Sequence, residues 1–181
     1  TTTPWTLPSN TALTVGKKID YVVINTYNQY THEPIRVVIA KDLVSKQFGK
    51  KYVAEQNLSN YTVGDKKIPY RIETNLKGSA LLDIRYEQLW EEAPLPISTP
   101  ENAFRVITGD FVTTEDGTGI VHTAPTFGAD DAKVAKEAIP EVPPLLVTDE
   151  HGNLVPLVDL QGRFRKEVGR LGGQFVKNEY Y

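Results

Sequence analysis

Short runs of β-branched and aromatic residues, closely spaced and separated by turn signals, are the feature that most constrains the fold of this chain. Turns are indicated by residue pairs such as Gly64–Asp65 and Asp116–Gly117. The runs rich in Val, Ile, Thr and Tyr predict strands over residues 11–15, 20–27, 35–40, 52–56, 68–74, 104–113, 119–124 and 144–149.

Helical patterns are scarce. Residues 41–48 predict a two-turn helix that Gly49 ends, and residues 128–139 predict a longer helix that stops at Pro140. Segment 77–92 is ambiguous between helix and coil. The apolar stripe expected on the longer helix consists of Ala132, Ala135, Ala138 and Ile139.

Many short strands with few helices favour a barrel or a sandwich over a doubly wound α/β sheet. We therefore predict a mainly β fold, a closed or partly closed β-barrel-like domain with a few peripheral helices. The 181 residues contain no domain-splitting linker, so one domain over residues 1–181 is expected. Because no methionine occurs, not even at position 1, we expect this domain to be excised from a larger protein.

The sequence lacks the residues that several kinds of site require. Without cysteine, disulfides and thiolate metal sites are excluded, and His32, His122 and His151 are not spaced as metal ligands, so no metal site is expected. The chain has no phosphate loop and no GxSxG elbow. Without cysteine or an evident Ser–His–acid pattern, a covalent nucleophile is disfavoured. No apolar run approaches the roughly 20 residues that span a bilayer, so no membrane partner is expected.

The net charge of −3 argues against a broad face that tracks nucleic acid. Residues 161–181 nevertheless carry a charge of +3. This basic stretch could contact a phosphate or two, although a solvated tail is the simpler interpretation.

The first polar patch is TTTPWTLPSN, residues 1–10. If this segment is extended, three consecutive threonines place hydroxyl groups on both of its faces, and Pro4 and Pro8 stiffen the backbone. Fixed donors and acceptors of this kind suit a small polar ligand or a water molecule. For this patch alone, a plain strand whose threonines were chosen for β propensity is the stronger alternative.

The second patch is GTGIVHTAPTFGADD, residues 117–131. His122 lies in the apolar run of a predicted strand, and Asp130 and Asp131 lie in the first turn of the predicted helix. A carboxylate there gains from the helix dipole and can hold a cation such as an ammonium group. The plainer alternatives are a hydrogen-bonded core histidine and an aspartate cap. Since one aspartate can cap, the other is left without a structural role.

Together the two patches resemble the editing domain, the connective insertion, of the isoleucyl-tRNA synthetases, a class I aminoacyl-tRNA synthetase family. The wider editing superfamily shares the TTxP start and the GTGxV turn. Trp5 and the sequence His122-Thr123-Ala124 match the isoleucyl branch and speak against valyl or leucyl specificity. The resemblance extends through ITGDFVTTEDGTG (107–119) and covers essentially the whole chain. Thr126-Phe127 lies where the family varies.

The resemblance implies post-transfer editing, in which valine wrongly esterified to isoleucine tRNA is hydrolysed. Valine lacks one methylene group of isoleucine, and a pocket built for isoleucine rejects it by only about 1–3 kcal/mol, a figure known from this synthetase family and not obtained from the present chain. A second site that admits valine and excludes isoleucine supplies the remaining discrimination.

The resemblance also assigns residues. Thr1, Thr2 and Thr3 line the pocket and orient the ester and the terminal adenosine, and Asp131 binds the α-ammonium group. These four form the expected catalytic set. His122 closes the pocket against the larger side chain, and Asn10 is also tied to editing. The expected substrate-binding residues are thus Thr2, Thr3, Asn10, His122 and Asp131. A positioned water would hydrolyse the ester, and no general base is assigned.

The expected partners are the 3′-terminal aminoacyl-adenosine of tRNA(Ile) and the rest of the synthetase chain. No cofactor is expected in this domain, since ATP and zinc would belong to the rest of the enzyme, and the domain is expected to be a cytoplasmic monomer. The alternative function is a non-catalytic module that binds the tRNA 3′ end or braces the synthetase.

Overall fold

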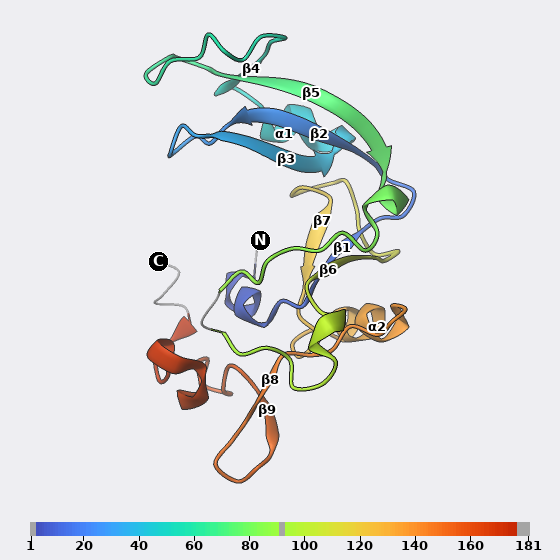
Figure 1. Ribbon diagram of the computed structural model, residues 1–181, viewed down its shortest axis with the longest axis vertical. Coiled ribbons are helices and arrows are strands. Elements are labelled where there is room, and N and C mark those ends of the chain that lie inside the picture. The colour runs from blue at the N-terminus through green and yellow to red at the C-terminus, as the bar shows by residue number, and fades with distance from the viewer. Residues whose placement is uncertain (1–2, 91–92, 177–181) are drawn as a thin grey trace. The chain divides into compact units, whose positions relative to one another are not determined.

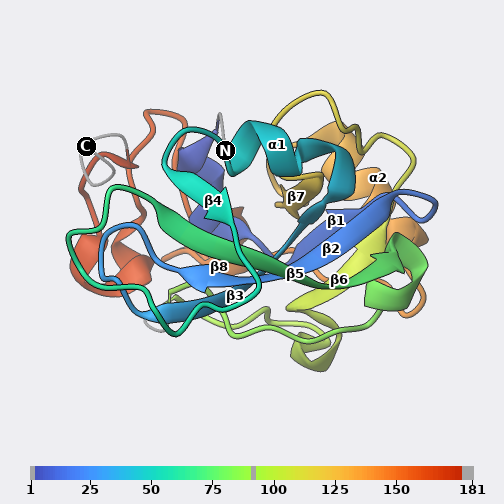
Figure 2. The same cartoon turned by 90° about the horizontal axis from the view of Figure 1, so that it is seen from above.

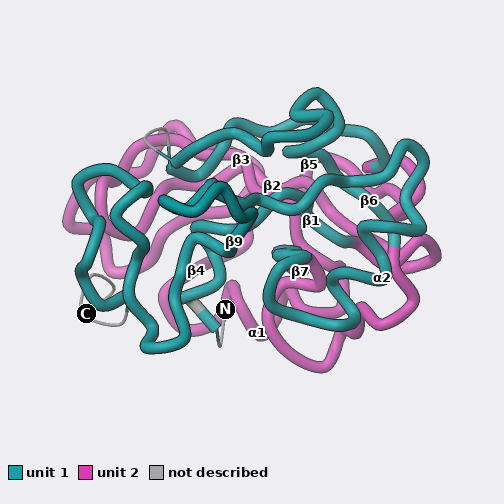
Figure 3. Tube along the Cα trace, turned by 90° about the horizontal axis from the view of Figure 1, so that it is seen from below, with its two compact units in different colours: residues 1–14, 82–108, 122–181 teal, residues 15–81, 109–121 magenta. Residues whose placement is uncertain are grey.

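A computed structural model describes residues 3–90 and 93–176 of the chain, and these divide into two compact units (Figure 3). Unit 1 comprises residues 1–14, 82–108 and 122–181, and unit 2 comprises residues 15–81 and 109–121.

The described elements are predominantly strands and single-turn helices (Figure 1). The strands are β1 (Ala12–Val15), β2 (Asp20–Tyr27), β3 (Pro34–Ala40), β4 (Tyr52–Ala54), β5 (Ile68–Lys77), β6 (Arg105–Thr108), β7 (Ile120–Thr123), β8 (Leu146–Thr148) and β9 (Leu154–Pro156). The α-helices are α1 (Val44–Gln47) and α2 (Ala129–Glu137). The 3-10 helices are η1 (Pro4–Ser9), η2 (Lys41–Leu43), η3 (Gly78–Leu81), η4 (Pro100–Asn102) and η5 (Lys166–Leu171).

Unit 2 is built on a four-stranded sheet in the order β3-β2-β5-β4. The central strand β2 pairs antiparallel with β3 and with β5, and a register shift between Val23 and Ile24 marks a bulge in the second pairing. Every second residue of β2, namely Val22, Ile24 and Thr26, is buried, which is the period of a strand with one face on the core. The short β4 pairs parallel with the beginning of β5.

The buried phenol of Tyr21 joins two loops of unit 2. Its oxygen accepts the Gly16 N–H at 3.0 Å and donates to the Gly119 carbonyl at 2.6 Å. Gly119 has φ +72°, and a Cβ atom there would lie 2.5 Å from the Ala40 Cβ atom. Backbone conformation and close packing therefore both require glycine at this position.

Strands β1 and β6 of the three-stranded sheet β6-β1-β7 contribute side chains to a hydrophobic core that they share with α2. In unit 1, Val134 and Ala135 of α2 pack with Ala12, Ile107 and Val142. The expected stripe on this helix is wrong in part, because Ala132 is exposed and Ile139 lies beyond the last helical residue with 91% of its surface exposed. A second core of unit 1 consists of Leu145, Val147, Leu157, Phe164, Val168 and Val176.

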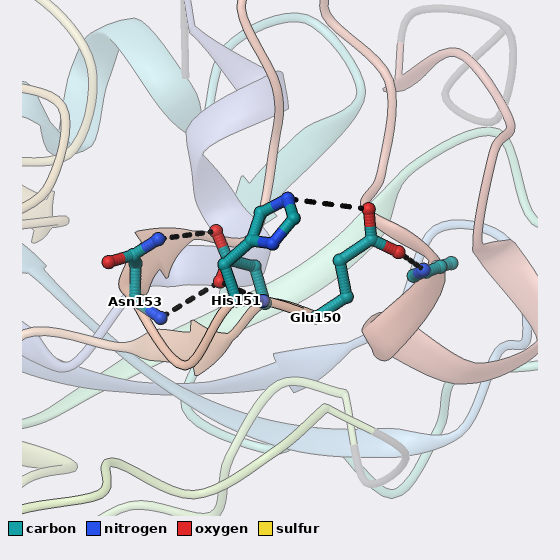
Figure 4. A network of polar contacts seen from close by, with 5 residues as sticks. Glu150, His151 and Asn153 are labelled. Carbon is teal, nitrogen blue, oxygen red and sulfur yellow. Dashed lines mark hydrogen bonds and ion pairs between the residues drawn. The ribbon is translucent and has the colours of Figure 1, made fainter.

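Asp149 organises the turn that follows β8. Its Oδ1 accepts the N–H groups of His151 and Asn153 at 2.9 and 2.8 Å, and its Oδ2 accepts the Asn153 amide at 3.3 Å (Figure 4). These hydrogen bonds, led by the one from the Asn153 N–H, lower the pKa of Asp149. The neighbouring Glu150 pairs with Lys166 on η5.

The turn at Asp159 is built in the same way. Its Oδ1 accepts the N–H groups of Gln161 and Arg163, each at 2.9 Å. Gly152 in the first turn and Gly162 in the second both have φ +80°. Both turns therefore have an aspartate that holds the returning backbone and a glycine in the left-handed region.

The mainly β fold with few helices is confirmed, and β2, β3, α2 and the helical segment after β3 lie where the sequence predicts them. β6 ends at Thr108, so the prediction of a strand over 104–113 is too long, and β9 was not predicted. No sheet in the described part of the chain is closed, so barrel closure is not confirmed. The single domain over residues 1–181 stays a prediction.

The prediction of an extended N-terminal segment is also wrong for the residues of that segment that the structure describes. Pro4–Ser9 forms η1, with Pro4 at the start of the helix. The fixed φ of proline near −65° suits the first helical position as well as an extended segment, and its missing N–H is not needed there. Thr1 and Thr2 lie outside the described residues.

Replacement of Gly119 by alanine separates backbone strain from crowding. Gly117 has nearly the same φ, +73°, but nothing lies within 4 Å of the place that an added Cβ atom would take there. Gly117→Ala should cost about 1–2 kcal/mol for the left-handed conformation, and Gly119→Ala should cost about 1–3 kcal/mol more because of the Ala40 contact. Urea unfolding of the two variants measures the difference, and equal losses would contradict the close packing.

Candidate functional site

A hydrogen bond between η1 and β7 forms the centre of the candidate site in unit 1. Thr6 Oγ1 lies 2.7 Å from His122 Nε2, and the same hydroxyl donates to the Thr3 carbonyl oxygen at 2.9 Å. Because a hydroxyl group has one proton, His122 Nε2 must be the donor to Thr6, which assigns the Nε2–H form of the neutral ring. The imidazole is therefore held in one orientation by the segment that begins with the threonines.

The half-buried ring of His122 is kept uncharged. Burial lowers the pKa of His122 below its usual value of 6.5, and the nearby Asp131 carboxylate opposes this effect without cancelling it. At neutral pH the ring is therefore a neutral, oriented group and not a cation. Asp131 lies close enough to His122 to act on it electrostatically.

Asp131 is held by the loop that leads into α2. Its Oδ2 accepts the N–H of Ala124 at 2.9 Å, and its side chain lies against Gly128, where an added Cβ would lie 3.2 Å from the Asp131 carboxyl carbon. No partner of the other carboxylate oxygen is found among residues 3–90 and 93–176. One oxygen thus fixes the side chain, while the other makes no hydrogen bond within that part of the chain.

The expectation that one aspartate caps α2 and the other has no structural role is wrong. The N-cap residue of α2 is Gly128, and no side chain caps it. Asp130 is exposed, whereas Asp131 has the structural hydrogen bond to Ala124. The residue expected to lack a structural role therefore has one, and only one of its two oxygens is used for it.

Both polar atoms of the Asn10 side-chain amide form hydrogen bonds within the protein. Nδ2 donates to the Ala12 carbonyl at 2.6 Å and more weakly to the Thr123 carbonyl at 3.4 Å, and Oδ1 accepts the Tyr86 hydroxyl at 2.5 Å. Burial raises the pKa of Tyr86, so its hydroxyl remains a donor. Asn10 is only 7% exposed, and this geometry fits a positioning role better than direct substrate contact.

Thr123, next to His122, is hydrogen-bonded to Thr11 and Thr14 near the beginning of the chain. Its carbonyl accepts the Thr11 N–H at 3.0 Å, and its hydroxyl lies 2.5 Å from that of Thr14.

Within the described residues, three buried hydroxyl groups lack a hydrogen-bond partner, those of Ser9, Thr11 and Thr126. Such groups are uncommon in folded proteins and indicate a place for water or a polar ligand.

The structure thus brings Thr3, Asn10, His122 and Asp131 together in unit 1, while Thr1 and Thr2 lie outside the described residues. The roles assigned to all six residues stay predictions. Thr6 and Tyr86 were not singled out from the sequence, although Thr6 lies within the first polar patch. Across the described ranges, no group of three or more metal-ligating side chains is found, and no helix is long and apolar enough to cross a membrane.

Titration of His122 tests the electrostatics of the site. Its NMR midpoint should lie below 6.5, and Asp131→Asn should lower it further because the opposing carboxylate charge is lost. Asp130→Asn is the matched control and should leave the midpoint unchanged. Since the unfolded chain binds this proton more readily, His122 should also reduce stability as the pH falls below about 6.5. A midpoint above 6.5 would contradict the buried neutral ring.

Comparisons with known proteins give this site a context. No protein-family model matches the chain. The isoleucine–tRNA ligase of Cytophaga hutchinsonii is 54% identical over 181 residues, which cover 99% of this chain and 16% of that protein. That of Bacteroides fragilis is 51% identical and is matched by 99% of this chain over 17% of its own length.

The solved structure of GlLeuRS-CP1 is similar over 74% of this chain and 40% of its own, with 20% identity and a TM-score of 0.45. The chain spans about a sixth of the length of the curated relatives that it matches. Along nearly its whole length, the chain is similar to one segment of these isoleucine–tRNA ligases.

Proposed function

We propose that this chain is the editing module of an isoleucine–tRNA ligase and hydrolyses Val-tRNA(Ile) to valine and free tRNA. The observation that supports this proposal most directly is the joint placement of Thr3, His122 and Asp131. Thr6 links Thr3 to His122, and Asp131 lies within electrostatic reach of the ring. The similarity to isoleucine–tRNA ligases agrees with it, because an enzyme for isoleucine has the greatest need to remove valine.

Asp131 is suited to bind the α-ammonium group of the esterified amino acid. It lies in the first turn of α2, where the helix dipole favours an ionised carboxylate. The Ala124 N–H fixes one oxygen, and the other is available for a charge-assisted hydrogen bond. A free ammonium group distinguishes an aminoacyl ester from a peptidyl ester, so this contact selects the substrate class.

His122 is suited to limit the size of the amino acid side chain. Its neutral ring is held by Thr6 and cannot swing aside without breaking that hydrogen bond. A rigid wall is needed because valine and isoleucine differ by one methylene group, and a wall that moved would admit both. Discrimination here depends on exclusion, which is sharper than the loss of a favourable contact.

The reaction requires a positioned water. Its oxygen attacks the ester carbonyl carbon, the bond between that carbon and the ribose oxygen breaks, and the ribose oxygen receives a proton. The negative charge that develops on the carbonyl oxygen would be met by hydroxyl or backbone N–H groups of the threonine segment. Orientation of ester and water supplies the main acceleration, and this chain needs no covalent intermediate.

Asp131→Asn should reduce the kcat/KM for Val-tRNA(Ile) deacylation by about 100-fold, the value of one hydrogen bond to a charged group. Asparagine can still accept the Ala124 N–H, so folding should be retained. Asp130→Asn, with the same charge change one residue away, is the control and should remain active. Release of radiolabelled valine measures both. Full activity of Asp131→Asn would remove the ammonium-binding role.

His122→Ala should make Ile-tRNA(Ile) a substrate while leaving the hydrolysis of Val-tRNA(Ile) within about tenfold of the parent. The reason is the space that the missing ring leaves beside the amino acid side chain. His151→Ala, at an exposed turn, is the control and should leave the preference unchanged. If His122→Ala still spares Ile-tRNA(Ile), the ring does not set the size limit.

A chain that hydrolyses neither ester would instead support the alternative function, a module that holds the tRNA 3′ end or braces the synthetase. Binding of a nonhydrolysable valyl-adenosine analogue separates that outcome from a damaged site. Tight binding without hydrolysis would identify a binding module.

A further inference from the structure

Unit 2 contains a groove that lies outside the candidate editing site. It has a volume of about 490 Å³. α1 and β4, which are joined by residues 48–51, lie side by side at this place (Figure 2). The groove is lined by residues 46–52, by Val37, Val38 and Ile39 of β3, and by Gln29 and Thr118.

The charged side chains that line this groove are all lysines, namely Lys46, Lys50 and Lys51. Lys46 is engaged by the Asp116 carboxylate and by the Glu115 carbonyl. Lys51 Nζ reaches only the neutral Gln29 side chain, at 3.5 Å. In the described part of the chain neither Lys50 nor Lys51 forms an ion pair. Two cations at one groove are therefore available for a ligand.

The charge of unit 2 reinforces this local excess. Unit 2 contains 11 lysine and arginine residues against nine aspartate and glutamate residues, a formal charge of +2, although the whole chain carries −3. The basic C-terminal stretch of unit 1 is different. There Arg163 pairs with Asp159, and Lys166 pairs with Glu150. Arg163 and Lys166 are therefore neutralised by neighbouring carboxylates, whereas Lys50 and Lys51 have no ion pair in the described part of the chain.

Aromatic side chains accompany the lysines. Tyr30, adjacent to Gln29, is 81% exposed. Tyr52 lines the groove and packs on Phe48 with 4.8 Å between ring centroids, and Phe48 also packs on Tyr70. Burial raises the pKa of Tyr52, and Tyr30 lies close enough to raise it further. An exposed ring beside a basic groove is typical of surfaces that bind single-stranded nucleic acid.

We propose that this groove binds a phosphodiester strand of the tRNA, with phosphates at Lys50 and Lys51 and a base stacked on Tyr30. The identity of the strand rests on the proposed function, whereas the chemistry rests on the groove alone. The lysines supply point charges for phosphate oxygens, and the flat phenol ring accepts any base. This contact would hold tRNA without reading its sequence.

The test is fluorescence anisotropy of this chain with a labelled tRNA(Ile) transcript and with a labelled 12-nucleotide single-stranded RNA. Lys50→Glu/Lys51→Glu should weaken binding at least tenfold and reduce the slope of log Kd against log salt by about 1 to 2, as expected for two lost phosphate contacts. Lys17→Glu/Lys18→Glu is the matched control, since these lysines are an adjacent exposed pair of the same unit outside the groove. Its binding and its slope should change much less.

Tyr30→Ala provides an independent arm. It should weaken binding of the single-stranded RNA about tenfold with no change in the salt slope, because stacking involves no counterion release. Equal losses for the groove and control charge variants would overturn the proposal, since only the overall charge would matter. Unchanged binding in the groove variant would also overturn it and would favour an acidic protein partner for the groove.

Failure of the groove and failure of the editing function can be told apart. Hydrolysis of 3′-valyl-adenosine, which lacks a phosphodiester strand, should be the same in the groove variant and the parent. If the parent does not hydrolyse this ester while RNA binding still depends on Lys50 and Lys51, the editing function fails and the groove stands. If hydrolysis occurs but RNA binding ignores these lysines, the groove fails alone.

Discussion

The hydrogen bonds that Thr123 makes with the first fourteen residues are the constraint on which the candidate site depends. Its carbonyl accepts the Thr11 N–H and the Asn10 amide, and its hydroxyl meets that of Thr14. All of these groups are buried, so each would be expensive to leave unpaired. Because His122 precedes Thr123, the same bonds determine where the imidazole stands relative to η1. Thr6 then fixes the ring itself.

Charge is distributed unequally between the two units, and the inequality matches the two tasks that we propose for them. Unit 1 has a formal charge of −5 and contains Asp131, the carboxylate proposed to hold an ammonium group, whereas unit 2 has +2 and contains the lysine groove. An aminoacyl-tRNA is itself divided in this way, with a cationic amino acid at the end of a polyanion. The average charge of −3 conceals this division between the units.

The sequence predicted the parts of the fold that depend on local pattern. β2 and β3 follow from β-branched runs with turns at each end, and α2 follows from Gly128 before it and Pro140 after it. η1 was not foreseen, because Pro4 is equally compatible with an extended and a helical first turn. Strand β9 was missed since three residues are too few for a periodic signal.

In the site, the sequence pointed to His122 and Asp131, but not to the groups that hold them. Thr6 and Tyr86 act through contacts with His122 and Asn10 that span 116 and 76 residues, and no pattern in the sequence shows such pairings. The lysine groove was missed for the same reason. Nothing in the sequence shows that Lys50 and Lys51 line a groove together with Gln29 and Thr118, which are far from them along the chain.

The 116 positions between Thr6 and His122 along the chain also affect when the site can form during synthesis. A ribosome that adds 5–20 residues per second needs roughly 6 to 23 seconds to pass from one to the other. Throughout this interval the threonine segment is out of the exit tunnel or within it without the strand that orders it. The first residues of the site to be made are thus among the last to find their place, and unit 1 can close only after residues of both units have been synthesised.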